Sequence, residues 1–397
     1  MTTAAGILNS LEFQMSILLF VALAGYLVSS KIKQSAVVGQ ILVGILIGPS
    51  LLGLITYTDF VSQLGHLGAV ILLFAVGLHF KIKDIMNLKY GIIALVGLVV
   101  PWMFGFITAH LFNFGFGGAV FIGTALTATS IAITANVLKE MGKLQTEVAK
   151  AIIGAAVIDD VLSLLALSVS EEIVTGSFSV YLTIITVVKA VGFIVIGVII
   201  GQFCARKLFT KIDNSNLAKL HPETVFIFSL MFAFLYAMAA EIIGLSAIIG
   251  SFLAGVSFEG VGLVHGKVFR EGTEYLQIIF GAIFFVSLGI LVELHTLDID
   301  LLIFTLVLTI VAVLTKVIGC GLAAKFQGMN IIDSLIIGFG MSPRGEVAMI
   351  VALIGLNKEL ITQNTYVSLV LMSLITTIIT PIVLRRLILR ETAEKIR

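Results

Sequence analysis

Two adjacent carboxylates, Asp159 and Asp160, stand in the middle of a long apolar run that extends from Gly154 past Leu165. An ionisable group at the centre of a bilayer costs at least about 2.5–3.5 kcal/mol, so it indicates a functional site by default. Two neighbouring carboxylates in a medium of low dielectric constant also resist simultaneous ionisation. Such a pair can bind a proton or a hard cation, but not both well, so the two compete for the site. A pair that serves only in buried salt bridges is the structural alternative.

Four further charged residues lie inside apolar runs, and Lys316 is the most centrally placed of them. It stands in the middle of residues 311–319 and cannot reach either membrane interface without strain. We therefore expect it to pair with an intramembrane acid, for which Asp159 or Asp160 is the natural choice. Lys189 has no obvious acidic partner in the sequence, and a structural role for it is as reasonable as a functional one.

Arg344 and Glu346, the other two charged residues, belong to a stretch that should not form a continuous helix. Pro343 lacks an N–H group and disfavours helix at the residue before it, and glycines such as Gly345 loosen the backbone. On a regular helix, residues two positions apart do not face each other, but in an unwound stretch they can. Arg344 and Glu346 form either a structural ion pair or a direct part of the coupling.

A second breakable stretch is the hydroxyl-rich run 124–130, which includes Thr129 and Ser130. Hydroxyl side chains compete for the backbone hydrogen bonds of a helix. The sequence therefore predicts two interrupted helices, one around residue 129 and one around residue 343.

The elements that position these residues follow from composition. The chain has 397 residues, 59% hydrophobic and 12% charged, with mean hydropathy +1.16 and net charge +1. Soluble domains carry about 25% charged residues, so this composition excludes a soluble enzyme, a nucleic-acid binder and a disordered scaffold. The fold class is an all-α polytopic membrane protein with about thirteen transmembrane helices. The predicted spans are 12–30, 36–55, 62–80, 88–112, 116–138, 146–173, 179–205, 221–243, 246–258, 271–292, 298–325, 331–356 and 364–388.

The basic residues set the orientation of these spans. Alternate connections and the C-terminal tail hold 20 of the 24 Lys and Arg residues, whereas the opposite connections hold acids such as Asp59 and Glu171. Basic connections face the cytoplasm. We therefore expect a protein of the cytoplasmic membrane with its N-terminus outside and its C-terminus in the cytoplasm.

The sequence also contains an internal repeat. Residues 35–44 resemble residues 246–255, and residues 74–78 resemble residues 286–290, both at an offset of about 211 residues. This offset corresponds to seven spans, so the second copy enters the membrane inverted. Six spans, a linker span and six inverted spans are typical of a secondary transporter with its binding site near the midplane.

On these motifs the chain resembles the second family of monovalent cation:proton antiporters. The Asp-Asp pair, the run Pro343–Val347 and the stretches 38–53, 72–78, 124–134 and 284–289 carry the resemblance, which covers nearly the whole chain. It implies the sodium/proton antiporter-like fold, in which two broken helices cross beside the aspartates. It also implies that Asp160 is the main ion-binding carboxylate and that Asp159 pairs with Lys316 in the proton-loaded state. In this resemblance Thr129, Ser130, Pro343 and Gly345 form the crossover, with Arg344 and Glu346 as supporting charges.

The resemblance further implies a division of labour along the chain. An ion-translocation core would comprise about 62–173 and 271–356 plus 364–388, and a dimerisation part about 12–55 and 221–258. Residues 179–205 would form the linker helix. We expect no soluble regulatory domain, because no nucleotide-binding glycine motif follows the last span.

The expected function is antiport of protons against sodium or lithium by alternating access. The Asp-Asp type implies an electrogenic exchange of two protons for one sodium ion. A potassium/proton antiporter is the main alternative, followed by a sodium-coupled symporter and a channel. An intramembrane aspartyl protease would need its two aspartates on different helices, and the adjacent Asp159 and Asp160 argue against it.

The expected partners are a second copy of the chain and membrane lipid, without nucleic acid or nucleotide. We expect no enzymatic activity, and no cofactor besides the transported ions.

Gln40 and His79 stand where members of the resembled family commonly have acidic residues. The sequence therefore does not show which residues sense pH.

Overall fold

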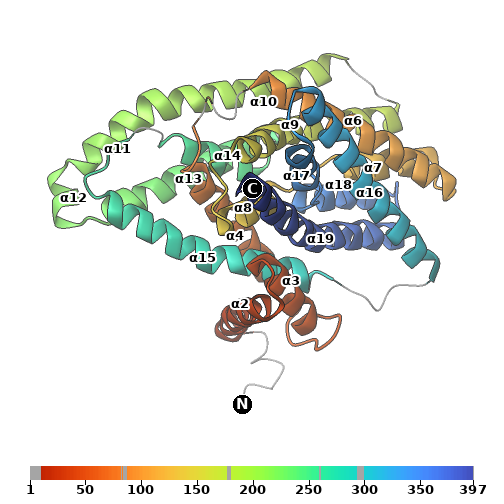
Figure 1. Ribbon diagram of the computed structural model, residues 1–397, viewed down its shortest axis with the longest axis horizontal. Helices are drawn as coiled ribbons and strands as arrows, with labels where there is room; N and C mark the ends of the chain where they lie inside the picture. Colours follow the sequence, from red (N-terminus) through yellow and green to blue (C-terminus); the bar gives the residue numbers. More distant parts are fainter. Residues whose placement is uncertain are drawn as a thin grey trace. The chain divides into compact units, whose positions relative to one another are not determined.

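The computed structural model describes residues 10–81, 83, 87–176, 180–258, 261–292 and 299–396, and within them the chain is helical without strands (Figure 1). The helices, labelled as in Figure 1, are α2 (Leu11–Ile32), α3 (Ala36–Ile47), α4 (Asp59–Gly77), α6 (Leu88–Leu111), α7 (Phe116–Ala125), α8 (Ile131–Glu140), α9 (Glu147–Thr175), α10 (Val180–Ile199), the π-helix η1 (Ile200–Ala205), α11 (Arg206–Asp213), α12 (Asn216–Leu220), α13 (Thr224–Ile243), α14 (Ala247–Val256), α15 (Gly266–Ile290), α16 (Ile299–Phe326), α17 (Ile331–Gly340), α18 (Glu346–Asn357) and α19 (Gln363–Ile396). The predicted all-α membrane fold is confirmed.

Nine of the helices in the described part of the chain are long and apolar enough to cross a membrane. They correspond to nine of the thirteen predicted spans. The other four spans are shorter or interrupted: 116–138 divides into α7 and α8, 331–356 divides into α17 and α18, α3 has twelve residues and α14 has ten. At 1.5 Å per residue a ten-residue helix is about 15 Å long, half the hydrocarbon thickness of a bilayer.

The second predicted span is shorter than expected. We predicted 36–55, but α3 ends at Ile47. Pro49 is the physical reason, because proline disfavours helical geometry at the residue before it, here Gly48. Residues beyond this point form turns.

The chain folds into two compact units. Unit 1 comprises Met1–Ser29, Gly39–Asp84 and Val188–Leu291, and unit 2 comprises Ser30–Val38, Ile85–Val187 and Val292–Arg397. These boundaries differ from the predicted core and dimerisation parts in two respects. Residues 62–84 and 271–291 of the predicted core group with unit 1, and residues 30–38 of the predicted dimerisation part group with unit 2. The predicted parts are defined by what they do in transport, so that division stays a prediction.

Within unit 1, two close helix contacts repeat each other. Helix α3 meets α15 where Gly44 faces Gly289, and α4 meets α14 where Gly77 faces Gly255. A methyl group at Gly289 would lie 2.9 Å from the Cα of Gly44, and one at Gly255 would lie 2.9 Å from the Cα of Gly77. Gly44 and Gly255 are 211 residues apart, and Gly77 and Gly289 are 212 residues apart. The repeat offset therefore maps one contact onto the other. Small residues allow such close backbone approach between membrane helices.

We expect Gly289→Ala to destabilise the protein by about 1–3 kcal/mol, the usual cost of overpacking a tight core. The added methyl group would meet backbone atoms of α3, including Ile45 N at 2.8 Å, and backbone cannot rotate away. Thermal unfolding of the purified protein in detergent measures the effect. Gly192→Ala in α10 is the matched control, because its methyl group would meet nothing within 4 Å and alanine is the better helix former. Equal melting temperatures for the two variants would contradict the prediction.

Within unit 2, the side chain of Glu140 contacts the first residue of α3. Its Oε2 accepts a hydrogen bond from the Ala36 N–H at 3.4 Å, and its Oε1 accepts one from Asn136 Nδ2 at 3.0 Å. Glu140 lies two residues beyond the predicted span 116–138. Burial raises the pKa of its carboxyl above the usual value, and the Ala36 N–H and the charge of Arg385 offset only part of that rise.

This raised pKa predicts how stability varies with pH. A carboxyl whose pKa is higher in the folded than in the unfolded chain costs no stability while it is protonated in both states. The cost begins as pH rises past the unfolded pKa and is complete above the folded pKa. The melting temperature of Glu140→Gln relative to the wild type should therefore increase between pH 4 and pH 8. Glu147→Gln, an exposed acid at the start of α9, is the control. A Glu140→Gln difference that stays constant with pH would refute the assignment.

Candidate ion-binding site

Asp159 and Asp160 lie in the middle of α9, which begins at Glu147 and is capped by the Thr146 hydroxyl. Asp159 is fully buried and Asp160 is 8% exposed. Adjacent side chains on a helix point about 100° apart, so the two carboxylates have different neighbours. Asp159 is turned fully into the protein, whereas Asp160 keeps a small accessible surface.

Lys316 comes to Asp159 from α16. Its Nζ lies 3.1 Å from both carboxylate oxygens of Asp159, and both side chains are fully buried. Of the two partners that the sequence left open, the structure brings Lys316 to Asp159. Removing either member of such a buried ion pair leaves an uncompensated charge, which is strongly unfavourable. The loss of either charge alone would therefore destabilise the pair.

A glycine on α6 makes room for this ion pair. A methyl group at Gly97 would lie 3.6 Å from Lys316 Nζ and still closer to the sulfur of Cys320. The sequence analysis did not single out Gly97. A glycine in an apolar helix is common, and only the packing of α6 against α16 shows that this one faces the lysine.

The two predicted helix breaks are present, and they are bonded to each other. Residues 126–130 separate α7 from α8, and residues 341–345 separate α17 from α18. The Ser130 N–H donates to the Pro343 carbonyl at 2.8 Å, and the Thr129 hydroxyl donates to the Met341 carbonyl at 3.2 Å. The Thr134 hydroxyl, which was not predicted to lie at the crossover, donates to the Gly340 carbonyl at 2.6 Å. Helix α17 packs against α16 and α19, and α8 and α18 pack against α19 (Figure 1).

Gly345 of the second break lies close to Ser130 of the first. A methyl group at this position would lie 2.7 Å from the Ser130 hydroxyl oxygen. Real Cβ atoms do not approach that closely, so any larger residue would push the breaks apart. Gly345 and Ser130 are also the N-cap residues of α18 and α8. The two half-helices thus begin next to each other.

Arg344 is fully buried and donates to two backbone carbonyls. Its Nη1 lies 2.6 Å from the Ala128 oxygen in the first break, and its Nη2 lies 3.1 Å from the Ala312 oxygen on α16. The side chain of Glu346 lies outside the part of the chain that the structure describes. The question of an Arg344–Glu346 ion pair therefore stays open, while Arg344 itself joins one break to the other and to the helix of Lys316.

One further oxygen lies next to the aspartates. Ser163 follows Asp160 by three residues on α9, so the two share a face of the helix. It is 1% exposed, and within the described chain its Oγ has no hydrogen-bond partner. The region thus offers carboxylate and hydroxyl oxygens in surroundings of low polarity, which suits a proton or a hard monovalent cation.

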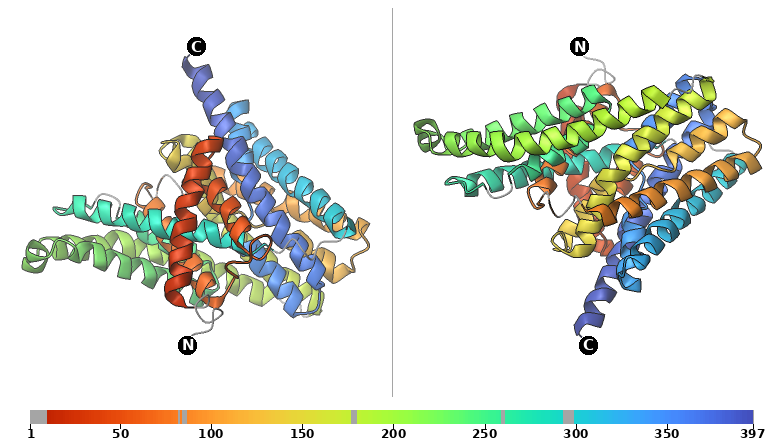
Figure 2. Two further views of the ribbon diagram at one scale, coloured as in Figure 1. Left: turned by 90° about the horizontal axis from the view of Figure 1, so that it is seen from below. Right: turned by 90° about the horizontal axis from the view of Figure 1, so that it is seen from above.

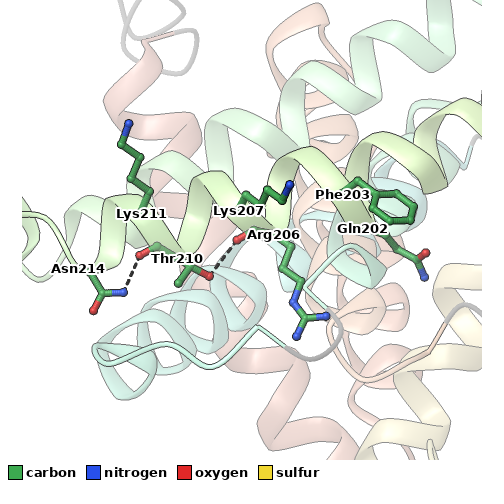
Figure 3. A pocket seen from close by; sticks show the side chains of 7 residues that line it. All are labelled: Gln202, Phe203, Arg206, Lys207, Thr210, Lys211 and Asn214. Atoms are coloured by element: carbon green, nitrogen blue, oxygen red, sulfur yellow. Dashed lines mark hydrogen bonds between the residues drawn. The ribbon is translucent and has the colours of Figure 1, made fainter.

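A surface pocket in unit 1 is lined by positively charged residues, unlike the acidic region around Asp160. It is lined by Gln202, Phe203, Arg206, Lys207, Thr210, Lys211 and Asn214 along η1 and α11 (Figure 3). Thr210 and Asn214 bond to backbone carbonyls of the same helix. Three positive charges and no carboxylate in this lining disfavour a cation, so the candidate cation site is the one around Asp160.

The chain is similar to known proteins over most of its length. Residues 17–390 match the family described as "Sodium/hydrogen exchanger, transmembrane". The chain is 34% identical over 371 residues to the Na(+)/H(+)-K(+) antiporter GerN of Bacillus cereus, covering 93% of this chain and 94% of GerN. It is 32% identical over 363 residues to a Na(+)/H(+) antiporter of Enterococcus hirae, covering 90% and 93%. The solved structure of the sodium proton antiporter MjNhaP1 of Methanocaldococcus jannaschii superposes with a TM-score of 0.67 at 18% identity, over 94% of both chains.

Proposed function

The chain belongs to the sodium/hydrogen exchanger family, and on this basis we propose that it is a secondary antiporter that exchanges protons for sodium or lithium. The observation that carries the proposal is the buried Lys316–Asp159 ion pair beside Asp160, in the same unit as two helix breaks that are hydrogen-bonded to each other. A purely structural ion pair would not need a second, partly accessible carboxylate at its side. Asp160 supplies that second carboxylate.

Binding begins at Asp160 in this proposal. A sodium ion displaces the proton of Asp160 and takes the carboxylate as its main ligand, and the Ser163 hydroxyl lies on the same face of α9 as a second oxygen. The positive charge of the ion then attracts Asp159 as well. As Asp159 turns toward the ion, Lys316 loses its counter-ion and releases its own proton, because a buried ammonium without a partner is too costly to keep.

The charge count gives the stoichiometry. Two protons leave, one from Asp160 and one from Lys316, and one sodium ion enters. The exchange is then electrogenic, with two protons per sodium ion, as in the Asp-Asp type of antiporter that the sequence resembles. A site that has lost both protons and holds no cation contains two uncompensated carboxylates. This charge disfavours the change from the inward-facing to the outward-facing state. The protein therefore changes state only with protons or sodium bound, which couples the two ions.

Alternating access around the broken helices exposes the site to one side of the membrane at a time. The protein works in this proposal as a homodimer in the cytoplasmic membrane, with its N-terminus outside and its C-terminus in the cytoplasm. It performs transport rather than enzymatic catalysis and needs no cofactor besides the transported ions. In this proposal the predicted core binds and moves the ions, the dimerisation part contacts the second copy, and the linker helix connects the two repeats.

Potassium is the second candidate substrate, because the name of the relative GerN includes potassium as well as sodium. Oxygen ligands alone do not rank sodium, lithium and potassium.

Transport by the purified protein in proteoliposomes tests the proposal. Sodium, lithium and potassium are supplied one at a time across a proton gradient, with and without a clamped membrane potential. We expect sodium- or lithium-dependent proton movement whose rate depends on the potential. Proton movement only with potassium would favour the second candidate. Ion flux that needs no proton gradient and moves no protons would overturn the antiporter assignment in favour of a channel.

A further inference from the structure

Two adjacent threonines on α19 hold the backbone of Arg344. The Arg344 N–H donates to the Thr376 hydroxyl at 3.1 Å, and the Thr377 hydroxyl donates to the Arg344 carbonyl at 2.8 Å. Both threonines are at most 1% exposed. A helix break leaves backbone groups without intrahelical partners, and buried groups of this kind need partners elsewhere. At Arg344 both partners come from one helix, α19, which Figure 2 shows running to the C-terminus.

This contact extends from α19 to the rest of the site. Arg344, held at its backbone, places its guanidinium on the Ala128 carbonyl of the first break and on the Ala312 carbonyl of α16. Ala312 precedes Lys316 by one helical turn. The charges of Arg344, Asp159 and Lys316 act on one another. The two hydroxyls thus anchor a permanent positive charge beside the ion pair.

The position of the threonines in the repeat adds a second, independent observation. Helices α9 and α19 are the last helices of the first and second repeats. Asp159 and Asp160 are residues 13 and 14 of α9, counted from Glu147, and Thr376 and Thr377 are residues 14 and 15 of α19, counted from Gln363. Counted from the start of each helix, the hydroxyl pair of the second repeat therefore lies within one residue of the position of the acidic pair in the first repeat. The first pair faces the transported ions, and the second pair holds a resident cationic residue.

We propose that Thr376 and Thr377 are positioning residues for transport, which fix Arg344 so that its charge sets the competition between protons and sodium at Asp159 and Asp160. This inference rests on the proposed antiport function and deepens it. In the proposed exchange the proton-loaded site holds two added positive charges and the sodium-loaded site holds one, so a nearby positive charge disfavours the proton-loaded state more. When Arg344 is held loosely, protons compete better, so more sodium and a higher pH are needed for the same rate.

Valine substitutions test the hydroxyls without changing the shape of the side chains. For Thr376→Val and Thr377→Val we expect the sodium KM at a fixed pH to rise about three- to tenfold, the usual effect of losing one buried hydrogen bond. The pH of half-maximal activity should move to a higher value, while the maximal rate at saturating sodium changes less. Thr376→Ser and Thr377→Ser keep the hydroxyl, so both should restore the wild-type KM and pH profile.

Thr380→Val is the matched control. Thr380 lies one turn further along α19, is 1% exposed, and within the described chain its hydroxyl has no hydrogen-bond partner. We expect this variant to keep the wild-type KM and pH profile. If Thr377→Val does not fold, Thr376→Val carries the same test, because it removes the other bond to Arg344.

Two results would overturn the inference while leaving the antiport function intact. In the first, folded Thr376→Val and Thr377→Val keep the wild-type KM and pH profile. In the second, the serine variants are as impaired as the valine variants, which would show that packing rather than the hydroxyl matters. A wild-type protein that exchanges no cation for protons in the same proteoliposomes would instead overturn the proposed function, and this inference with it.

Discussion

Asp160→Asn should reduce sodium-dependent proton movement by about two orders of magnitude or more, because an ionic ligand contributes up to about 3 kcal/mol. Asparagine keeps the shape of the side chain and one oxygen, but it neither carries a negative charge nor takes up a proton. The variant therefore loses both the sodium ligand and the proton-binding group at this position. Everted membrane vesicles, with a pH-sensitive dye to follow proton movement after sodium is added, measure the effect.

Glu171→Gln provides the matched control for this experiment. Glu171 lies on the same helix, near its end, and is paired with Lys358 at 3.2 Å with about a third of its side chain exposed. The same change from carboxylate to amide should leave the sodium-dependent signal unchanged there. Full activity in Asp160→Asn, with the protein present in the membrane at wild-type amounts, would rule out Asp160 as the ion-binding carboxylate.

Lys316→Met should both abolish coupled exchange and lower the free energy of unfolding by about 3–5 kcal/mol, the cost of breaking a buried ion pair from one side. Asp159 keeps its burial but loses its partner, whose Nζ lies 3.1 Å from both of its oxygens. The unpaired carboxylate can escape this cost only by taking up a proton. The loss in melting temperature should therefore be smaller at acid pH than at neutral pH.

The double variant Asp159→Asn with Lys316→Met separates charge from packing. It contains no unpaired charge, so we expect it to recover most of the stability that Lys316→Met loses, while coupled exchange stays absent. A double variant as unstable as the single one would show that the methylene groups of Lys316, rather than its charge, stabilise the site. In that case the ion pair would not be the energetic centre of the site.

The long spans and the two interruptions could be predicted from the sequence for simple physical reasons. Apolar length is a strong signal in a bilayer, and proline, glycine and clustered hydroxyls weaken a helix wherever they occur. The partner of Lys316 could be narrowed to two residues but not to one. Which of two neighbouring aspartates faces α16 depends on the rotation of α9 about its axis, which apolar composition on all sides does not determine.

The contacts of Arg344 and the role of α19 could not be predicted. Arg344 donates to the carbonyls of Ala128 and Ala312, and every residue has a carbonyl, so such acceptors leave no mark in a sequence. Thr376 and Thr377 resemble the many hydroxyl residues that bond only to their own helix. Thr376 donates to the Ser373 carbonyl, and the single O–H of Thr377 is shared between that carbonyl and the Arg344 carbonyl. Only the fold shows that they also bond to the second break.

The paired glycine contacts of unit 1 have a consequence for the order in which the chain is made. Gly44 meets Gly289, and Gly77 meets Gly255, so α3 and α4 pack against helices that leave the ribosome some 180 to 250 residues later. At about 5–20 residues per second the wait is roughly 10–50 seconds. During that time the glycine faces of α3 and α4 must lie against lipid or an insertion chaperone. Their final partners do not yet exist, so unit 1 can be completed only after the second repeat has begun to enter the membrane.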